Sequence, residues 1–269
     1  MRASASRRRP GAAVLVLAGV GLALLVLPLV ALVVRAPWGE LPALLASEAV
    51  LQALALSLGT AAVSTVACLV LGIPLAVLLA HAEHGAAVPR RLLRAAITIP
   101  MVLPPVIGGI ALLLLLGRRG LLGQWLAEVG IALPFTTPAV VIAQTFVAMP
   151  FLVFAVEGAL RSADRRSEAA ADSLGASRAQ VFRLVTLPLV APGVAAGAVL
   201  CFTRALGEFG ATITFAGSFP GVTRTLPIAS YLAMNSDPDT AIALALVLLA
   251  VSLVVLLALR DRWLPGVAR

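Results

Sequence analysis

Two residues of opposite charge, Arg204 and Glu208, lie four positions apart inside an otherwise apolar stretch. On a helix this spacing puts both side chains on one face, where they can pair. Either charge alone near the centre of a bilayer would cost roughly 2.5–3.5 kcal/mol, and such residues usually face a bundle interior or a water-filled cavity. Thr203 and Thr212 add hydroxyl groups. The stretch therefore predicts a polar lining, or alternatively a local ion pair that holds its helix to a neighbour or to a second copy.

A second stretch is marked by residues that disturb a helix. Pro100, Pro104 and Pro105 remove backbone donors, and Gly108 follows closely. A proline inside a helix costs about 3 kcal/mol or more, and in a membrane the freed carbonyl groups must find other partners. One interpretation is a bend that lines a pathway and acts as a hinge. The other is a fixed kink that only shapes packing, which we favour because a proline does not itself show motion.

The sequence contains no catalytic or metal-binding pattern. Without lysine it has no GxxxxGK[ST] loop, and GxSxG, HExxH and GxGxxG are also missing. His81, Glu83 and His84 lie close together without an evident fourth ligand, so we interpret them as a solvated loop. Cys68 and Cys201 have no ligand spacing and are expected to be small packing residues. We therefore expect no catalytic residue, metal or cofactor, and a conduit rather than an enzyme.

The elements that position these residues follow from composition. Of the 269 residues, 61% are hydrophobic and 12% charged, against about 45–50% and 25% in soluble domains, which nearly rules out a free-standing cytosolic enzyme. A helix needs about 20 apolar residues to cross a bilayer, and open strands cannot cross it. The first apolar run is too long for a cleaved signal. We predict an all-α polytopic membrane protein with six spans: 11–34, 49–80, 95–117, 138–156, 187–203 and 241–259.

The positions of the arginines predict the orientation. The net charge is +8, and all 20 basic side chains are arginine. Fifteen fall in the two tails and in alternate loops, four fall in the other loops, and Arg204 lies within a span. Short arginine-rich loops stay in the cytoplasm, so both termini are expected there, and no nucleic acid is needed to explain the charge. Glu157, at the end of the fourth run, is expected to pair with cytoplasmic arginines.

The loop 161–188 between the fourth and fifth spans predicts two short helices. Ser167 can cap the first, and Gly175 suits a left-handed stop after it. Ser177 and Gln180 form a capping box for the second. A partner's groove and the ends of neighbouring spans both remain possible covers for its apolar side. The apolar and basic residues of the second helix are Arg178, Val181, Phe182, Arg183, Leu184 and Val185.

This loop resembles the EAA loop of the permease subunits of bacterial ABC importers, whose pattern is E-A-A-x3-G-x9-I-x-L-P. Nine residues after Gly175 lead to Val185, and Leu187 and Pro188 complete the second half. The first half departs, because Glu168 lies seven positions before Gly175 rather than six. In that family the loop forms coupling helices that sit in a cleft of a separate ATPase subunit. The resemblance assigns this role to Glu168, Ala169, Ala170, Gly175, Arg178, Phe182, Val185, Leu187 and Pro188.

Two further stretches resemble the molybdate branch of the family: 99–109 with 117–123, and 204–214 with 220–229. Sulfate and tungstate permeases share much of this pattern. The resemblance implies the type I ABC importer permease fold, with the first span and its tail in 1–48, the transmembrane domain in 49–262 and a cytoplasmic tail in 263–269. It also implies a bacterial cytoplasmic (inner) membrane location, a homodimer, two ATPase subunits and an extracytoplasmic oxyanion-binding protein.

The expected function is molybdate import by alternating access, driven by ATP hydrolysis on the partner. A tetrahedral dianion would pass over weak, distributed hydroxyl and amide donors, because tight binding impedes release. An alternative is a sulfate or tungstate permease. A secondary transporter driven by an ion gradient would need an inverted repeat and more buried acids, and a scaffold would leave the loop pattern unexplained. The pathway candidates are Pro104, Pro105, Gly108, Thr203, Arg204, Glu208 and Thr212.

Overall fold

The computed structural model describes residues 11–82, 87–163, 167, 170–171 and 173–263. Within these residues the secondary structure is helical and contains no strand. Five helices are long and apolar enough to cross a membrane, and they cover five of the six predicted runs. They are α1 (Ala12–Val34), α3 (Glu48–His81), α7 (Thr137–Ser162), α10 (Leu187–Leu206) and α13 (Pro238–Trp263).

The third predicted span, 95–117, is not one continuous helix. It is divided between α4 (Ala87–Val102) and α5 (Pro105–Leu116), which meet at an angle of 114°. The break falls at Pro104, whose ψ of 131° is extended. The physical reason is the pair of adjacent prolines, because a residue that precedes a proline is driven out of the helical region. The bent pair brings the number of possible crossings to six.

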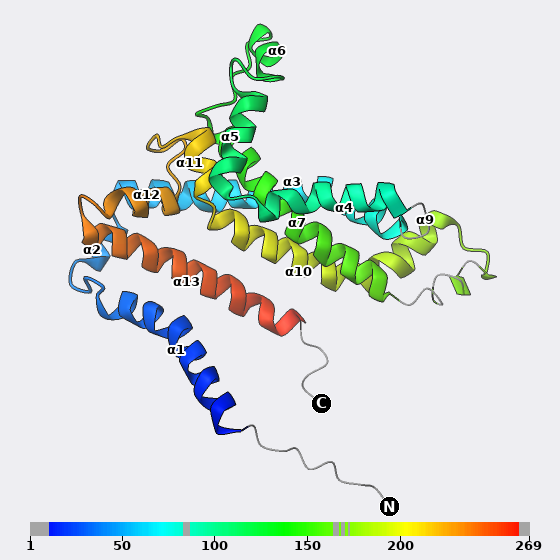
Figure 1. Ribbon diagram of the computed structural model, residues 1–269, viewed down its shortest axis with the longest axis horizontal. Helices are drawn as coiled ribbons and strands as arrows, with labels where there is room; N and C mark the ends of the chain where they lie inside the picture. Colours follow the sequence, from blue (N-terminus) through cyan, green and yellow to red (C-terminus); the bar gives the residue numbers. More distant parts are fainter. Residues whose placement is uncertain (1–10, 83–86, 164–166, 168–169, 172, 264–269) are drawn as a thin grey trace, which may run out of the picture.

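The core of the bundle lies where α3, α7 and α10 pack together (Figure 1). Close approach of α7 and α10 depends on small residues: a Cβ atom on Gly197 would lie 2.9 Å from Cδ1 of Leu152. Cys68 of α3 and Cys201 of α10 are both fully buried in this core. Their predicted role as packing residues is confirmed, although the sequence did not place them in the same cluster.

Two parts of the chain extend from the bundle (Figure 1). No side chain of α1 is buried, and its contacts with the bundle are made mainly with α13. α5 points away from the bundle, toward the top of Figure 1, and carries α6 (Gly123–Glu128) at its far end. α6 is a short helix that contains Trp125. The remaining short helices are α2 (Leu41–Leu45), α9 (Arg178–Val181), α11 (Gly210–Ala216) and α12 (Leu226–Ala233).

The two ends of the bundle differ in charge. At one end α3 and α7 finish and α4 and α9 begin, and Figure 1 shows α2 and α12 at the opposite end. Basic side chains gather at the first end, which we call the arginine-rich end. Its described arginines include Arg90, Arg91, Arg94, Arg161 and Arg183.

Candidate functional site

Arg204 and Glu208 form the ion pair that the sequence predicts. Nη1 of Arg204 lies 2.6 Å from Oε2 of Glu208, and only 1% of the surface of Glu208 is exposed. The second carboxylate oxygen, Oε1, accepts the backbone N–H of Ala211 at 2.9 Å. The carboxylate is therefore neutralised on one side and hydrogen-bonded on the other, as a buried charge must be.

The two residues do not share a helix face, so this part of the prediction is wrong. α10 ends at Leu206, and Glu208 lies in the turn before α11. The reason is competition for the backbone: the Glu208 carboxylate accepts an N–H group from the first turn of α11, which favours a new helix start over continuation of α10. Arg204 lies in the last turn of α10, where a positive charge is also favoured by the helix dipole.

The hydroxyl groups around this pair have different environments. Thr203 is partly exposed, and its hydroxyl donates to the carbonyl of Val199 at 2.9 Å. Thr212 is fully buried, and its hydroxyl has no hydrogen-bond partner among the residues that the structure describes. Thr214 donates to Gly210 O at 2.8 Å. The Thr203 and Thr214 protons are thus engaged within their own helices.

The structure brings the proline-rich stretch and the charged stretch together. α5 packs against α11, and a Cβ atom on Gly210 would lie 3.0 Å from Cβ of Pro105. A Cβ atom on Gly109 would lie 2.8 Å from Ala211 O, and one on Gly108 would lie 2.9 Å from Cε1 of Phe146. Glycine is therefore needed at both positions for α5 to fit against α7 and α11. Two segments about a hundred residues apart in the sequence form one wall.

The loop 161–188 has the turn chemistry that its sequence predicts. Gly175 has a φ of +81°, and the N–H of Ala176 donates to Ala171 O at 3.1 Å, as in a Schellman stop. The Ser177 N–H donates to Oε1 of Gln180 at 2.8 Å, and the Gln180 N–H donates back to Oγ of Ser177 at 3.4 Å. The capping box and the left-handed glycine are confirmed. Glu168 and Ala169 lie outside the described residues.

The second helix of this loop is continuous with the fifth span. α9 runs into the π-helix η2 (Phe182–Thr186), which runs directly into α10. Val181 is buried, but Phe182 is 52% exposed and Leu184 is 70% exposed. Leu174, beside Gly175, is 88% exposed. Neighbouring elements of this chain thus cover Val181 and part of Val185, and we call the exposed residues Leu174, Phe182 and Leu184 the loop surface.

A buried carboxylate joins two arginines at the arginine-rich end, and one of them also lies over an aromatic ring. Both oxygens of Glu157 accept from the guanidinium of Arg94 at 3.1 Å, and Nε of Arg161 lies 3.2 Å from Oε1. The Arg94 guanidinium carbon also lies 5.4 Å from the centre of the Phe154 ring. The predicted pairing of Glu157 with arginines is confirmed. Arg94 as the bidentate partner was missed, because nothing local relates residues 63 positions apart.

A second polar contact within the bundle was also missed. Oγ of Ser64 on α3 donates to Oε1 of Gln144 on α7 at 3.1 Å, and Gln144 is fully buried. A single amide side chain inside an otherwise apolar run was the available signal for this contact. Buried amides need partners, and a hydroxyl on the adjacent span is the nearest type of donor.

The described part of the chain brings no group of three or more His, Cys, Asp or Glu side chains together. His81 ends α3, where its Nδ1 lies 2.8 Å from Val77 O. Glu83 and His84 lie outside the described residues. The candidate site is therefore built from one ion pair, hydroxyl groups, close-packed glycines and an exposed apolar loop. That set can line a path or bind a partner.

Comparisons with known proteins agree with this arrangement. The model of the family described as "Binding-protein-dependent transport system inner membrane component" matches residues 72–266. The molybdenum transport system permease protein ModB of Mycobacterium tuberculosis (strain ATCC 25618 / H37Rv) is 50% identical over 242 residues, which are 90% of each chain. ModB of Escherichia coli (strain K12) is 38% identical over 219 residues, which are 81% of this chain and 94% of that protein.

A solved structure agrees with the fold. The crystal structure of a bacterial ABC transporter involved in the import of the acidic polysaccharide alginate has a TM-score of 0.72 to this chain at 18% identity. The match covers 94% of this chain and 95% of that one. The predicted all-α ABC importer permease fold is confirmed.

Proposed function

Because this chain belongs to the family of binding-protein-dependent transport system inner membrane components, we propose that it is the permease subunit of an ABC importer for molybdate. The similarity to molybdenum permeases over nine-tenths of the chain carries the proposal. ATP hydrolysis is assigned to a separate subunit, since the sequence has no phosphate-binding loop.

The loop surface is proposed to bind that ATPase subunit. Phe182 and Leu184 are exposed at the arginine-rich end, next to a glycine turn and a capping box that fix the path of the backbone. An aromatic side chain that the chain itself leaves half exposed is the type of residue that anchors an interface. Because η2 continues into α10, a push on the loop acts directly on the helix that carries Arg204. The proposed coupling residues are Glu168, Ala169, Ala170, Gly175, Arg178, Phe182, Val185, Leu187 and Pro188.

The wall formed by α5, α11 and the end of α10 is proposed to line the translocation pathway. The Arg204 side chain keeps 26% exposure although it is paired, so it can attract an oxyanion without losing Glu208. Partial neutralisation keeps this contact weak, which release requires. The proposed lining residues are Pro104, Pro105, Gly108, Thr203, Arg204, Glu208 and Thr212.

The proposed assembly contains two copies of this chain, two ATPase subunits and an extracytoplasmic oxyanion-binding protein in the cytoplasmic membrane of a bacterium. The arginine bias supports an orientation with both termini and the arginine-rich end in the cytoplasm. The first span and its tail (1–48) then precede the transmembrane domain (49–262), and 263–269 form a cytoplasmic tail.

Reconstitution tests the proposal. The chain is placed in vesicles with its ATPase, and the vesicles are given molybdate together with the binding protein. We expect uptake that needs ATP, and sulfate should compete poorly if molybdate is the cargo. Stronger uptake of sulfate or tungstate would reassign the cargo within the same class. Uptake by the chain alone, down an ion gradient and without ATPase, would refute the ABC mechanism.

A further inference from the structure

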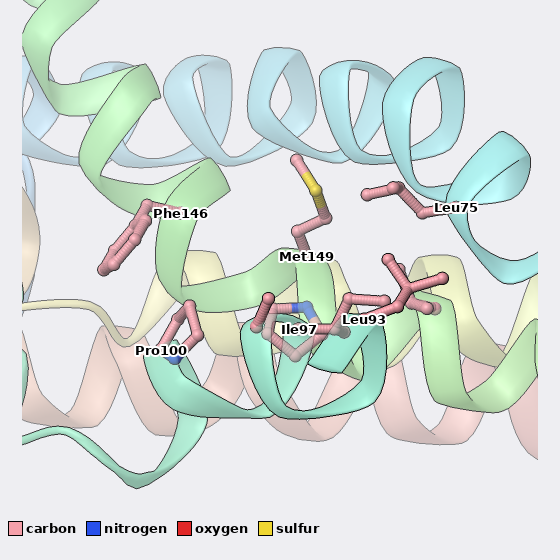
Figure 2. Close-up of a pocket in the computed structure, with 9 residues that line it drawn as sticks. Leu75, Leu93, Ile97, Pro100, Phe146 and Met149 are labelled. Atoms are coloured by element: carbon pink, nitrogen blue, oxygen red, sulfur yellow. The ribbon is translucent and has the colours of Figure 1, made fainter. Parts of the chain in front are cut away.

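An apolar groove of about 280 Å³ lies between α3, α4 and α7 (Figure 2). All nine residues that line it are apolar, and Figure 2 shows Leu75 of α3, Leu93 and Ile97 of α4, and Met149 of α7 around it. Pockets that enclose drug-sized ligands are about 300–1,000 Å³. The groove therefore has the size of one narrow apolar group. Ala96 on its rim is exposed, so the groove is accessible from outside the chain.

The way α4 is attached explains why the groove exists. α4 is tied to α7 by the bidentate contact between Arg94 and Glu157. Two residues after Arg94 comes the small Ala96, which lines the groove together with Pro150 of α7. The ion pair holds the two helices together, while these short side chains leave space between them.

An arginine, Arg90, extends the groove face of α4. Arg90 is seven positions before Ile97, which places it only about 20° away around a helix of 3.6 residues per turn. It is also one turn beyond Leu93, toward the arginine-rich end. The structure shows no hydrogen bond or ion pair of Arg90 with any residue that it describes, whereas Arg94 is engaged by Glu157. Within the described part of the chain, a guanidinium that no carboxylate neutralises thus extends one end of an entirely apolar groove.

We propose that the groove binds an acyl chain of an anionic phospholipid whose headgroup phosphate pairs with Arg90. The chain would lie against Leu93, Ile97 and Met149, and the guanidinium would extend to the level of the headgroups, as arginine does at membrane interfaces. The surrounding charge favours an anionic lipid, because among the described residues Glu157 pairs with Arg94 and Arg161, while Arg90 and Arg91 add two further positive charges at the same end. The inference rests on the proposed orientation, since anionic lipids are concentrated in the cytoplasmic leaflet. It does not depend on the cargo.

Retained lipids test the proposal directly. The full chain is placed in nanodiscs with equal amounts of phosphatidylglycerol and phosphatidylcholine, and the lipids retained after purification are counted by native mass spectrometry. We expect phosphatidylglycerol to be enriched. Arg90→Gln should lower its enrichment about fivefold, the factor that one arginine contributes at an anionic surface. Ala96→Trp, which fills the groove, should lower retention of both lipids.

Arg119→Gln is the matched control, because it removes the same charge from an exposed position between α5 and α6. It should leave the enrichment unchanged. Equal retention of the two lipids, or equal effects of Arg90→Gln and Arg119→Gln, would overturn the proposal. Displacement of the lipid by inorganic phosphate alone would also overturn it, because it would show a phosphate site that binds no acyl chain. Cross-linking of Ala96→Cys between two copies would instead make the groove a protein interface. Thermal unfolding shows whether each variant is folded, and molybdate uptake is measured separately, so failure of one proposal leaves the other standing.

Discussion

Replacement of the Arg204–Glu208 pair by neutral residues separates a pathway role from a structural one. Arg204→Met alone leaves the Glu208 carboxylate, which is 1% exposed, with a single hydrogen bond from Ala211. Removal of one partner of a buried pair costs about 3–5 kcal/mol. Because Arg204 itself keeps 26% exposure, we expect the lower end, about 3 kcal/mol. Glu208→Gln restores neutrality and keeps an oxygen that can accept from Ala211.

The double variant Arg204→Met/Glu208→Gln is therefore expected to regain most of the stability that Arg204→Met loses, since neutral replacement of a buried pair is often close to neutral in energy. Thermal unfolding of the purified chain measures this recovery. Co-purification with the ATPase subunit should be normal. ATP-driven molybdate uptake should nevertheless stay absent, because the positive charge that attracts the oxyanion is gone. Recovery of uptake along with stability would refute a pathway role and leave Arg204 as a structural partner of Glu208.

Three further predictions test other contacts. Phe182→Ala should leave the stability of the chain nearly unchanged, because Phe182 is 52% exposed. It should weaken binding of the ATPase subunit by about 2 kcal/mol or more, as loss of an interface anchor does. Unchanged affinity in a binding titration would exclude Phe182 from the interface. Gly193→Ala should destabilise by about 1–3 kcal/mol, because its Cβ would overlap Cβ of Ala159. Gly158→Ala is the control, because a Cβ atom there would have no atom within 4 Å, and it should not destabilise the chain. Equal melting temperatures of the two variants would contradict the packing of α7 against α10. Hydrogen bonds from Thr240 lower the pKa of Asp237 below its ordinary value of 3.8, so its contribution to stability is present above that pH and is lost as the pH falls through the folded-state pKa. Asp237→Asn should therefore reduce the fall in melting temperature at acid pH. An unchanged dependence of melting temperature on pH would show that the contact between Asp237 and Thr240 does not cause that fall.

Features that depend on a few neighbouring residues could be predicted from the sequence. Gly175 adopts the left-handed conformation expected of it, and Ser177 and Gln180 form both hydrogen bonds of the capping box. The long apolar runs also became helices, because a bilayer leaves the backbone no other way to satisfy its polar groups. In these cases the physical cause lies within a few residues of its effect.

Features that depend on competition or on distant packing could not be predicted. The spacing of Arg204 and Glu208 suggested one helix face, yet α10 ends between these two residues, at Leu206. The Glu208 carboxylate instead accepts the Ala211 N–H in the first turn of α11. The three prolines indicated a disturbance but not an angle of 114°. Arg94 finds Glu157 only because α4 folds back along α7. The first outcome was decided by competition for a nearby backbone N–H, and the last by a partner 63 positions away in the sequence.

The glycines that follow the bend limit the motion that a hinge at the prolines could make. If α5 moved freely about Pro104, the positions that face its neighbours would not need to be small. Gly109, however, has no room for a Cβ atom, which would lie 2.7 Å from Cβ of Thr214 and 2.8 Å from Ala211 O. α5 is thus packed closely against α11, and α11 is held to Glu208 by the Ala211 amide. Any motion at the prolines must move α5 and α11 together. Because Ala211 is bonded to Glu208, that motion also strains the Arg204–Glu208 ion pair. The moving unit would therefore be the α5–α11 wall, with the ion pair as its connection to α10 and, through η2, to the loop surface.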